Sequence, residues 1–267
     1  MPETEFTAHG ADAKLACVRR GHGAPLLLIM GVAGHQKVWG DEFLDRLSAE
    51  FEVITYDHRG IGDSSFAESF THADLVADAV AVLDWAGLSD AHVLGFSMGG
   101  TIAQHLAIDH PERVRTLSLV ATFPDVDDVF GEGVLSFAAA GQAEDAETAT
   151  WILFEANVSK AHSEIDENFP PFLEAAGAAK VPTPVAMAQV VASASHDVTA
   201  RLAAIKAPTL VVHGTQDAII KASAGERLAE EIPGARLELW PGVGHHIAWE
   251  TGGRLAEAVI NHIKAAD

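Results

Sequence analysis

The sequence is poor in cysteine and in cations, and each shortage excludes a class of protein. Cys17 is the single cysteine among 267 residues, so no disulfide can form within the chain, which fits a reducing compartment. Only 17 lysines and arginines stand against 38 aspartates and glutamates, which gives a formal net charge of −21. Such a chain repels phosphates, so we expect neither a nucleic-acid partner nor docking on an anionic membrane surface.

Long apolar runs are also missing. The longest, such as PLLLIMGVAG at 25–34, are far shorter than the roughly 20 residues that a membrane-spanning helix needs. The first residues, MPETEFTAHGADAK, are acidic and polar and contain no apolar signal core. Together with the single cysteine, these features lead us to expect a cytoplasmic protein. The sequence does not specify the oligomeric state and is compatible with a homo-oligomer.

What the sequence does contain is a regular alternation of short apolar runs with amphipathic stretches. Several runs are apolar over most of their length, which is typical of strands buried on both faces. The predicted strands lie at 26–30, 51–56, 91–96, 114–120, 208–214 and 235–240. The predicted helices lie at 73–87, 98–111, 223–234 and 251–267. The alternation predicts an α/β fold with a mostly parallel central sheet and helices on both faces.

One region interrupts this alternation. From Phe123 to Arg201 the sequence is rich in alanine and acidic residues and contains helical segments but no convincing strand. The prolines of NFPPF (168–172) and VPTP (181–184) are expected to separate its helices, because proline disrupts a helix interior. We therefore predict a core domain made of residues 1–122 and 202–267, with residues 123–201 inserted as a helical cap, or lid.

Residues 95–100 read GFSMGG, a G-x-S-x-G pattern between a predicted strand and a predicted helix. In that context the serine stands on a strained strand-to-helix turn that exposes its hydroxyl at the end of the sheet. We expect Gly95 and Gly99 to be needed, because a Cβ at either position would crowd the turn. The helix N-terminus behind the serine also favours developing negative charge. Ser97 is therefore the predicted nucleophile, and the alternative is an ordinary turn serine.

A serine hydroxyl needs a base that removes its proton, and the base needs an acid that orients it. The loop after the last predicted strand offers two histidines, of which we favour His245 as the base and assign His246 to a helix start or a structural role. The loop after the strand at 208–214 holds Asp217, the predicted acid. The chain order Ser97, Asp217, His245 is the order used by folds that present a serine on such a turn.

An acyl-transfer reaction also requires hydrogen-bond donors for the oxyanion. The backbone N–H of Met98, the residue after the nucleophile, is one predicted donor. The second is expected in the MGVAG turn after the first predicted strand, where Gly31 and Gly34 flank Val32. We predict that Val32 donates its N–H to the oxyanion. The alternative is an ordinary glycine turn with no catalytic role.

These motifs carry a resemblance to the α/β-hydrolase family along nearly the whole chain, through PLLLIMG, YDHRGIGDSS, GFSMGG, GTQD and GVGHHIAWE. The resemblance implies that Arg59 and Asp63 brace a loop and are not catalytic. One departure is Met30, where many relatives have histidine; the oxyanion donor is a backbone group, so this departure concerns the bracing of the loop. Within the family the chain is similar to bacterial methyl esterases of the aclacinomycin type, and enol-lactone hydrolases and cofactor-free haloperoxidases share much of the pattern.

We therefore expect a serine hydrolase that cleaves a small-molecule carboxylic ester or lactone through an acyl-enzyme intermediate, with no cofactor and no metal. The main alternatives are a haloperoxidase or perhydrolase that uses the same triad, and a non-catalytic ligand-binding protein of the same fold. Cleavage of a carbon–carbon bond in the same fold is also open, but no feature of the sequence favours it. A metalloenzyme would draw its ligands from His35, His213, His245, His246 and Asp217. Their spacing matches no standard zinc pattern.

Candidates for contacts with the substrate are large apolar side chains, mostly within the inserted segment. They are Trp39, Phe123, Phe130, Trp151, Phe154, Phe169 and Met187. Their character favours an apolar or aromatic acyl or alcohol group, and the carboxylates of the same segment disfavour a polyanionic substrate.

Overall fold

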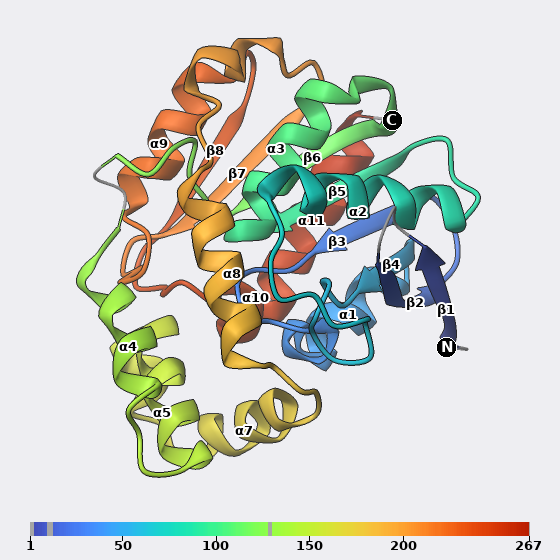
Figure 1. The fold of residues 1–267 in the computed structure, drawn as a ribbon. Helices are drawn as coiled ribbons and strands as arrows, with labels where there is room; N and C mark the ends of the chain where they lie inside the picture. The colour runs from blue at the N-terminus through green and yellow to red at the C-terminus, as the bar shows by residue number, and fades with distance from the viewer. Residues whose placement is uncertain (1–2, 10–12, 128–129, 267) are drawn as a thin grey trace.

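A computed structural model describes residues 3–9, 13–127 and 130–266 of the chain. Its centre is an eight-stranded sheet in the order β1-β2-β4-β3-β5-β6-β7-β8 (Figure 1). The strands are β1 (Glu3–His9), β2 (Lys14–Gly21), β3 (Pro25–Ile29), β4 (Glu52–Tyr56), β5 (Ala91–Phe96), β6 (Val114–Val120), β7 (Thr209–Gly214) and β8 (Arg236–Trp240). The strands from β3 to β8 are parallel to one another, whereas β2 is antiparallel to both of its neighbours.

The predicted α/β fold with its mostly parallel sheet is confirmed. Each of the six strands predicted from an apolar run is present, with its ends within one residue of those expected. The edge strand β1 and its neighbour β2 were not predicted. The signal for β2 is weak because it carries Lys14, Arg19 and Arg20 and buries only part of its residues. Residues 1, 2 and 267, at the ends of the predicted core domain, lie outside the described residues.

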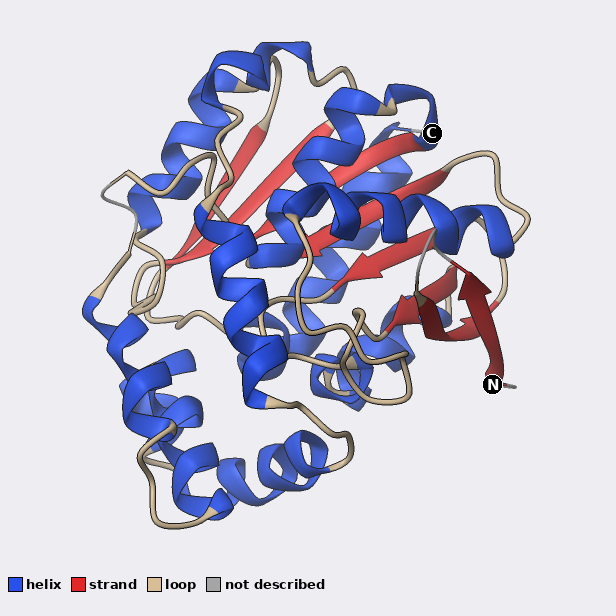
Figure 2. Ribbon diagram, in the orientation of Figure 1, coloured by secondary structure: helices blue, strands red, loops and turns tan. Residues whose placement is uncertain are grey.

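Helices cover both faces of the sheet (Figure 2). The α-helices are α1 (Asp41–Ser48), α2 (His72–Trp85), α3 (Met98–Asp109), α4 (Ser136–Ala140), α5 (Ala146–Asn157), α6 (Lys160–Ser163), α7 (Phe169–Gly177), α8 (Thr183–Ala194), α9 (Ala222–Glu231), α10 (Ile247–Glu250) and α11 (Gly252–Ala266). The 3₁₀-helices are η1 (Gln36–Trp39), η2 (Pro111–Arg113), η3 (Glu132–Leu135), η4 (Asp166–Asn168) and η5 (Thr199–Ala204). In the described part of the chain, none of the helices combines the length and apolar character that a membrane crossing requires.

Each face of the sheet has its own apolar core. Helices α2, α3 and α9 pack on one face, where Leu75, Ile102 and Leu228 are fully buried. Helices α1 and α11 pack on the other face, where Phe43 and Val259 are fully buried. Because helices cover both faces of the sheet, catalytic or binding residues are expected in the loops at the ends of the strands.

The described part of residues 123–201 contributes helices α4 to α8 and no strand of the sheet. Two prolines lie in the first turn of α7, and Pro182 is the residue before α8. The prolines thus lie where one helix ends and the next begins, in agreement with the expectation that they separate the helices. The inserted helices lie on the side towards which the parallel strands point (Figure 2). That this segment acts as a cap over a substrate stays a prediction.

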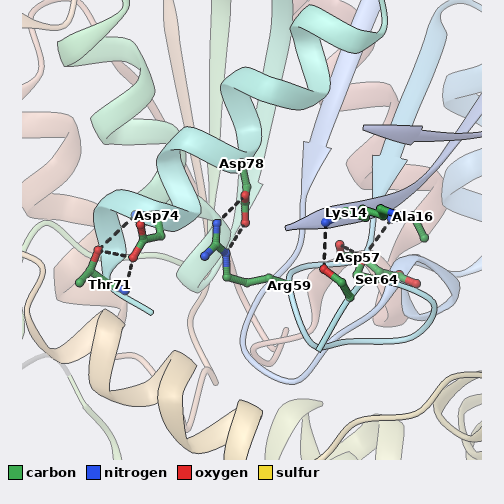
Figure 3. Close-up of polar contacts among 9 residues, drawn as sticks. Lys14, Ala16, Asp57, Arg59, Ser64, Thr71, Asp74 and Asp78 are labelled. Atoms are coloured by element: carbon green, nitrogen blue, oxygen red, sulfur yellow. Dashed lines mark hydrogen bonds and ion pairs between the residues drawn. The ribbon is translucent and has the colours of Figure 1, made fainter. Parts of the chain in front are cut away.

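The loop after β4 is braced by a buried ion pair. Arg59 donates from Nε and Nη2 to the two carboxylate oxygens of Asp78 in α2, at 2.7 and 2.8 Å (Figure 3). Their side chains are 3% and 0% exposed. In the same loop Ser64 donates to the carbonyl oxygen of Asp57 at 2.7 Å. Arg59 thus has the bracing role expected of it, whereas the side chain of Asp63 is exposed.

Replacing Arg59 with methionine should lower the free energy of unfolding by about 3–5 kcal/mol, because it leaves the Asp78 carboxylate buried without its guanidinium partner. Urea denaturation followed by circular dichroism measures this loss. The double variant Arg59→Met/Asp78→Leu should recover most of it, because two apolar side chains then replace the pair. Equal stability of the wild type and Arg59→Met would show that the pair does not hold the loop.

Candidate active site

Ser97 stands between β5 and α3 in a strained backbone conformation. Its φ of 54° and ψ of −122° lie in a region that residues with a side chain rarely adopt. A Cβ on Gly95 would collide with the carbonyl oxygen of Gly99, and one on Gly99 would collide with that of Ile29. These two glycines therefore permit the turn, and the turn holds Ser97 at the carboxyl end of a central strand.

Ser97, His245 and Asp217 form one hydrogen-bonded chain. His245 Nε2 lies 3.1 Å from Ser97 Oγ, and His245 Nδ1 lies 2.7 Å from Asp217 Oδ2. Because a carboxylate can only accept, Nδ1 carries the proton, and Nε2 keeps a lone pair that accepts from the serine hydroxyl. The three residues follow β5, β7 and β8, whose carboxyl ends share one edge because these strands are parallel. The structure thus brings together the three residues that the sequence singled out.

The side chain of Asp217 is fully buried and accepts hydrogen bonds on both carboxylate oxygens. Oδ1 accepts from the N–H groups of Ile219 and Ile220 at 2.9 and 2.8 Å. Oδ2 accepts from His245 and also from His213 Nε2, at 3.1 Å. Burial disfavours the charge, but attraction to His245 and the hydrogen bonds from both histidines outweigh it, so the pKa of Asp217 is held below its usual range. Asp217 is therefore an anion that can stabilise an imidazolium.

Two further histidines lie next to these three residues, and one of them, His213, also donates to Asp217. His246 is the residue before α10, and its ring stacks on Phe96 at 4.9 Å. Burial, with a contribution from neighbouring His245, lowers the pKa of His246 to about 3, so it stays neutral. This agrees with its assignment to a helix start. Sequence reasoning considered His213 only as a possible metal ligand, although its position at the end of a strand, four residues before Asp217, was an available signal for a contact with Asp217.

The two predicted oxyanion donors flank Ser97. Met98 is the first residue of α3, where backbone N–H groups lack an acceptor within the helix. The turn after β3 approaches from the other side, since a Cβ on Gly31 would lie 3.0 Å from that of Ser97. Among the described residues, no acceptor is hydrogen-bonded to the N–H of Val32. Both N–H groups are therefore available, and their role at an oxyanion stays a prediction.

Side chains from two other segments hold the turn after β3. Ala33 has a positive φ of 58°, and its N–H donates at 2.7 Å to Gln189 of α8, which is fully buried. His58 donates from Nε2 to the carbonyl oxygen of Met30 at 2.9 Å. These two hydrogen bonds brace the turn, in which Met30 stands where many relatives have histidine. Neither side chain was predicted; a polar residue on the buried face of a helix was the signal for Gln189.

The residues predicted to contact substrate lie in different environments. Trp39 is buried, and its ring centroid lies 6.2 Å from that of Phe96, which in turn lies 5.0 Å from the His245 ring. Trp39 therefore supports the ring next to the active-site histidine. Phe123 is buried against Phe130, with ring centroids 5.6 Å apart.

The remaining candidates divide between the interior and the surface of the inserted segment. Phe154 is fully buried in an aromatic cluster that includes Trp151 and Phe169. Met187 on α8 is 55% exposed. A surface hollow of about 590 Å³ beside η1, α1 and α7 is lined by none of the predicted contact residues. The substrate contacts therefore stay predictions.

Comparisons with known proteins agree on one fold. A family model described as an alpha/beta hydrolase fold matches residues 24–251. The chain is 32% identical over 239 residues to a putative carbamate hydrolase, RutD, from Azorhizobium caulinodans, which covers 86% of this chain and 87% of that protein. It is 32% identical over 277 residues to rhodomycin D methylesterase DnrP from Streptomyces peucetius, with 91% and 92% covered. The solved enol-lactonase from Burkholderia xenovorans has a TM-score of 0.84 at 21% identity, covering 97% of this chain and 100% of that one, which shows a common fold.

Proposed function

The chain belongs to the α/β-hydrolase family, and from this premise we propose that it is a serine hydrolase that cleaves a carboxylic ester or lactone through an acyl-enzyme intermediate. The observation that carries the proposal is the hydrogen-bonded chain from Ser97 through His245 to Asp217, at a strained turn on a central strand. The methylesterase relative supports an ester as the substrate class. We also propose a cytoplasmic location, which the single cysteine supports.

Each group of the site has a role in the proposed reaction. Ser97 Oγ attacks the carbonyl carbon while His245 Nε2 takes its proton, and the N–H groups of Met98 and Val32 donate to the oxygen that becomes negative. His245 then gives the proton to the leaving alcohol oxygen, which leaves an ester on Ser97. Water attacks that ester with His245 again as base, which releases the acid and restores the serine. Asp217 keeps the imidazole in the required tautomer and stabilises its cation.

A carbamate is a second candidate substrate class, favoured by the identity with a putative carbamate hydrolase over most of both chains. The same nucleophile and base would attack a carbamate carbonyl, so the covalent route through Ser97 is unchanged. When the alcohol leaves, the group that remains on Ser97 is a carbamoyl group in place of the acyl group of an ester. Perhydrolysis is a further variant, in which peroxide replaces water at the acyl-enzyme.

A fluorophosphonate probe should label the wild-type protein at Ser97, because only a serine activated by a base reacts readily. Mass spectrometry of the labelled peptide locates the modification. Ser97→Ala should not be labelled, and Ser89→Ala, at an exposed serine, should react like the wild type. A non-catalytic binding protein would leave all three unlabelled. A panel of methyl esters, p-nitrophenyl esters, lactones and carbamates then decides the substrate class.

A further inference from the structure

Three histidines that are far apart in the sequence meet outside the candidate active site. His72 is the first residue of α2, His105 lies in α3, and His196 lies between α8 and η5. The ring centroids of His72 and His105 are 4.7 Å apart, and each lies 5.3 Å from that of His196. One ring nitrogen from each histidine lies within 4.8 Å of the other two. Spacing in the sequence could not reveal this cluster, because it joins three separate segments.

Hydrogen bonds to groups outside the cluster fix the tautomer of two of the rings. Thr101 Oγ1 donates to the carbonyl oxygen of Met98 at 2.7 Å, so it can only accept from His72 Nε2, which lies 2.8 Å away. The carbonyl oxygen of Phe123 accepts from His196 Nε2 at 3.2 Å. The nitrogen with the free lone pair is therefore Nδ1 in both rings. His196 Nδ1 is buried and has no hydrogen-bond partner.

The tautomer of His105, the third ring, is fixed in the same way. His105 Nδ1 lies 3.3 Å from a carboxylate oxygen of Asp109, which can only accept, so Nε2 keeps the lone pair. Arg201 also contacts this carboxylate, which keeps Asp109 ionised. Each histidine therefore donates one N–H outwards, to a hydroxyl, a carboxylate or a carbonyl, and retains one basic nitrogen. Histidines that bind metals show this arrangement, because the outer acceptor fixes the tautomer and strengthens the ligand.

We propose that His72, His105 and His196 bind a divalent transition-metal ion of the zinc type, at a site separate from Ser97, Asp217 and His245. Neutral imidazole is a preferred ligand of Zn²⁺, Co²⁺, Ni²⁺ and Cu²⁺, and three nitrogens leave one tetrahedral position for water. His72 and His196 are buried and His105 is half-buried, so the ion would be largely enclosed by protein and reachable from one side.

Bound metal would stabilise the junction between the core and the inserted segment. It would connect α2 and α3 to the chain between α8 and η5, where the inserted segment returns to the sheet (Figure 1). Thr101, which accepts from His72, also bonds the carbonyl oxygen of Met98 in the first turn of α3. Binding to the folded state alone raises the melting temperature in proportion to the logarithm of metal concentration. The ion takes no part in the proposed ester hydrolysis.

Titration of tag-free protein, first freed of metal by a chelator, tests the proposal. Isothermal titration with Zn²⁺ should show one saturable site per chain and a raised melting temperature, and Co²⁺ should give the visible absorption of a site with nitrogen ligands. His105→Gln should weaken Zn²⁺ binding by at least the roughly 10–100-fold that loss of an outer-shell partner alone produces. His105 is half-buried, so this variant should fold, which circular dichroism checks. His110→Gln, at the residue after α3, is the matched control and should bind like the wild type.

Two results would overturn the proposal. One is the absence of saturable Zn²⁺ binding by the folded wild type. The other is unchanged affinity and stoichiometry in both His105→Gln and a second variant, His196→Asn, which would locate the metal elsewhere. Neither result bears on Ser97, so a failure here is distinguishable from a failure of the proposed hydrolase activity.

Discussion

Replacing Ser97 with alanine should lower kcat for the best ester substrate by about 10⁴–10⁶-fold and leave the fold intact. The reason is that the hydroxyl is the atom to which the acyl group becomes bonded, so no neighbouring side chain can substitute for it. Its removal costs little stability, because the Ser97 side chain contacts His245 through one hydrogen bond and is 9% exposed. The activity that remains would come from the oxyanion donors and from substrate binding alone.

Initial rates with a p-nitrophenyl ester, together with thermal unfolding, measure both parts of this expectation. Met98→Leu is the matched control, since it changes the neighbouring side chain with little change of volume but keeps the backbone N–H that is proposed as a donor. It should retain kcat within about tenfold, because the proposed donor group itself is unchanged. If Ser97→Ala kept the wild-type rate, the acyl-enzyme route through this serine would be wrong, whatever the fold.

The parts of the fold that the sequence predicts are those where local pattern and tertiary environment agree. A strand buried on both faces, such as β5, is apolar at most of its positions, so its ends can be predicted from the residues. The strand β2, next to the edge strand β1, carries three cations and has only three of its eight residues buried, so the same signal is absent. The predicted resemblance to α/β hydrolases and to methyl esterases among them is confirmed by the family model and the methylesterase relative.

The residues of the candidate site also fall into those that the sequence predicts and those that it does not. Ser97, Asp217 and His245 each follow a recognisable strand, and the parallel sheet then brings them to one edge, so chain order was sufficient. Gln189 and His58 are different, because each acts on a turn from a distant segment and no local pattern shows which segment it contacts. The same holds for the histidine cluster formed by His72, His105 and His196. Aromatic residues of the inserted helices are ambiguous for a further reason: Phe154 could have faced a substrate, but it packs into an aromatic cluster.

Replacing Asp217 with asparagine should lower kcat by about 10⁴-fold at neutral pH, because the change reverses the tautomer of His245. Oδ1 of Asp217 accepts from the N–H groups of Ile219 and Ile220, and these two bonds fix which side of an amide can hold its oxygen. The NH₂ group of asparagine would then face His245 Nδ1. Nδ1 would have to accept, the proton would move to Nε2, and Nε2 could no longer take a proton from Ser97.

The rate should be compared in Asp217→Asn and in Asp63→Asn, whose carboxylate is exposed and which should behave like the wild type. A kcat for Asp217→Asn within about tenfold of the wild type would contradict the tautomer argument. Acid unfolding gives an independent readout with a definite sign. In the wild type the pKa of Asp217 is lower when folded than its ordinary value of 3.8, so as pH falls through that value the unfolded chain takes up the proton first and stability is lost. Asparagine cannot take up a proton, so the variant should lose less stability than the wild type below about pH 4.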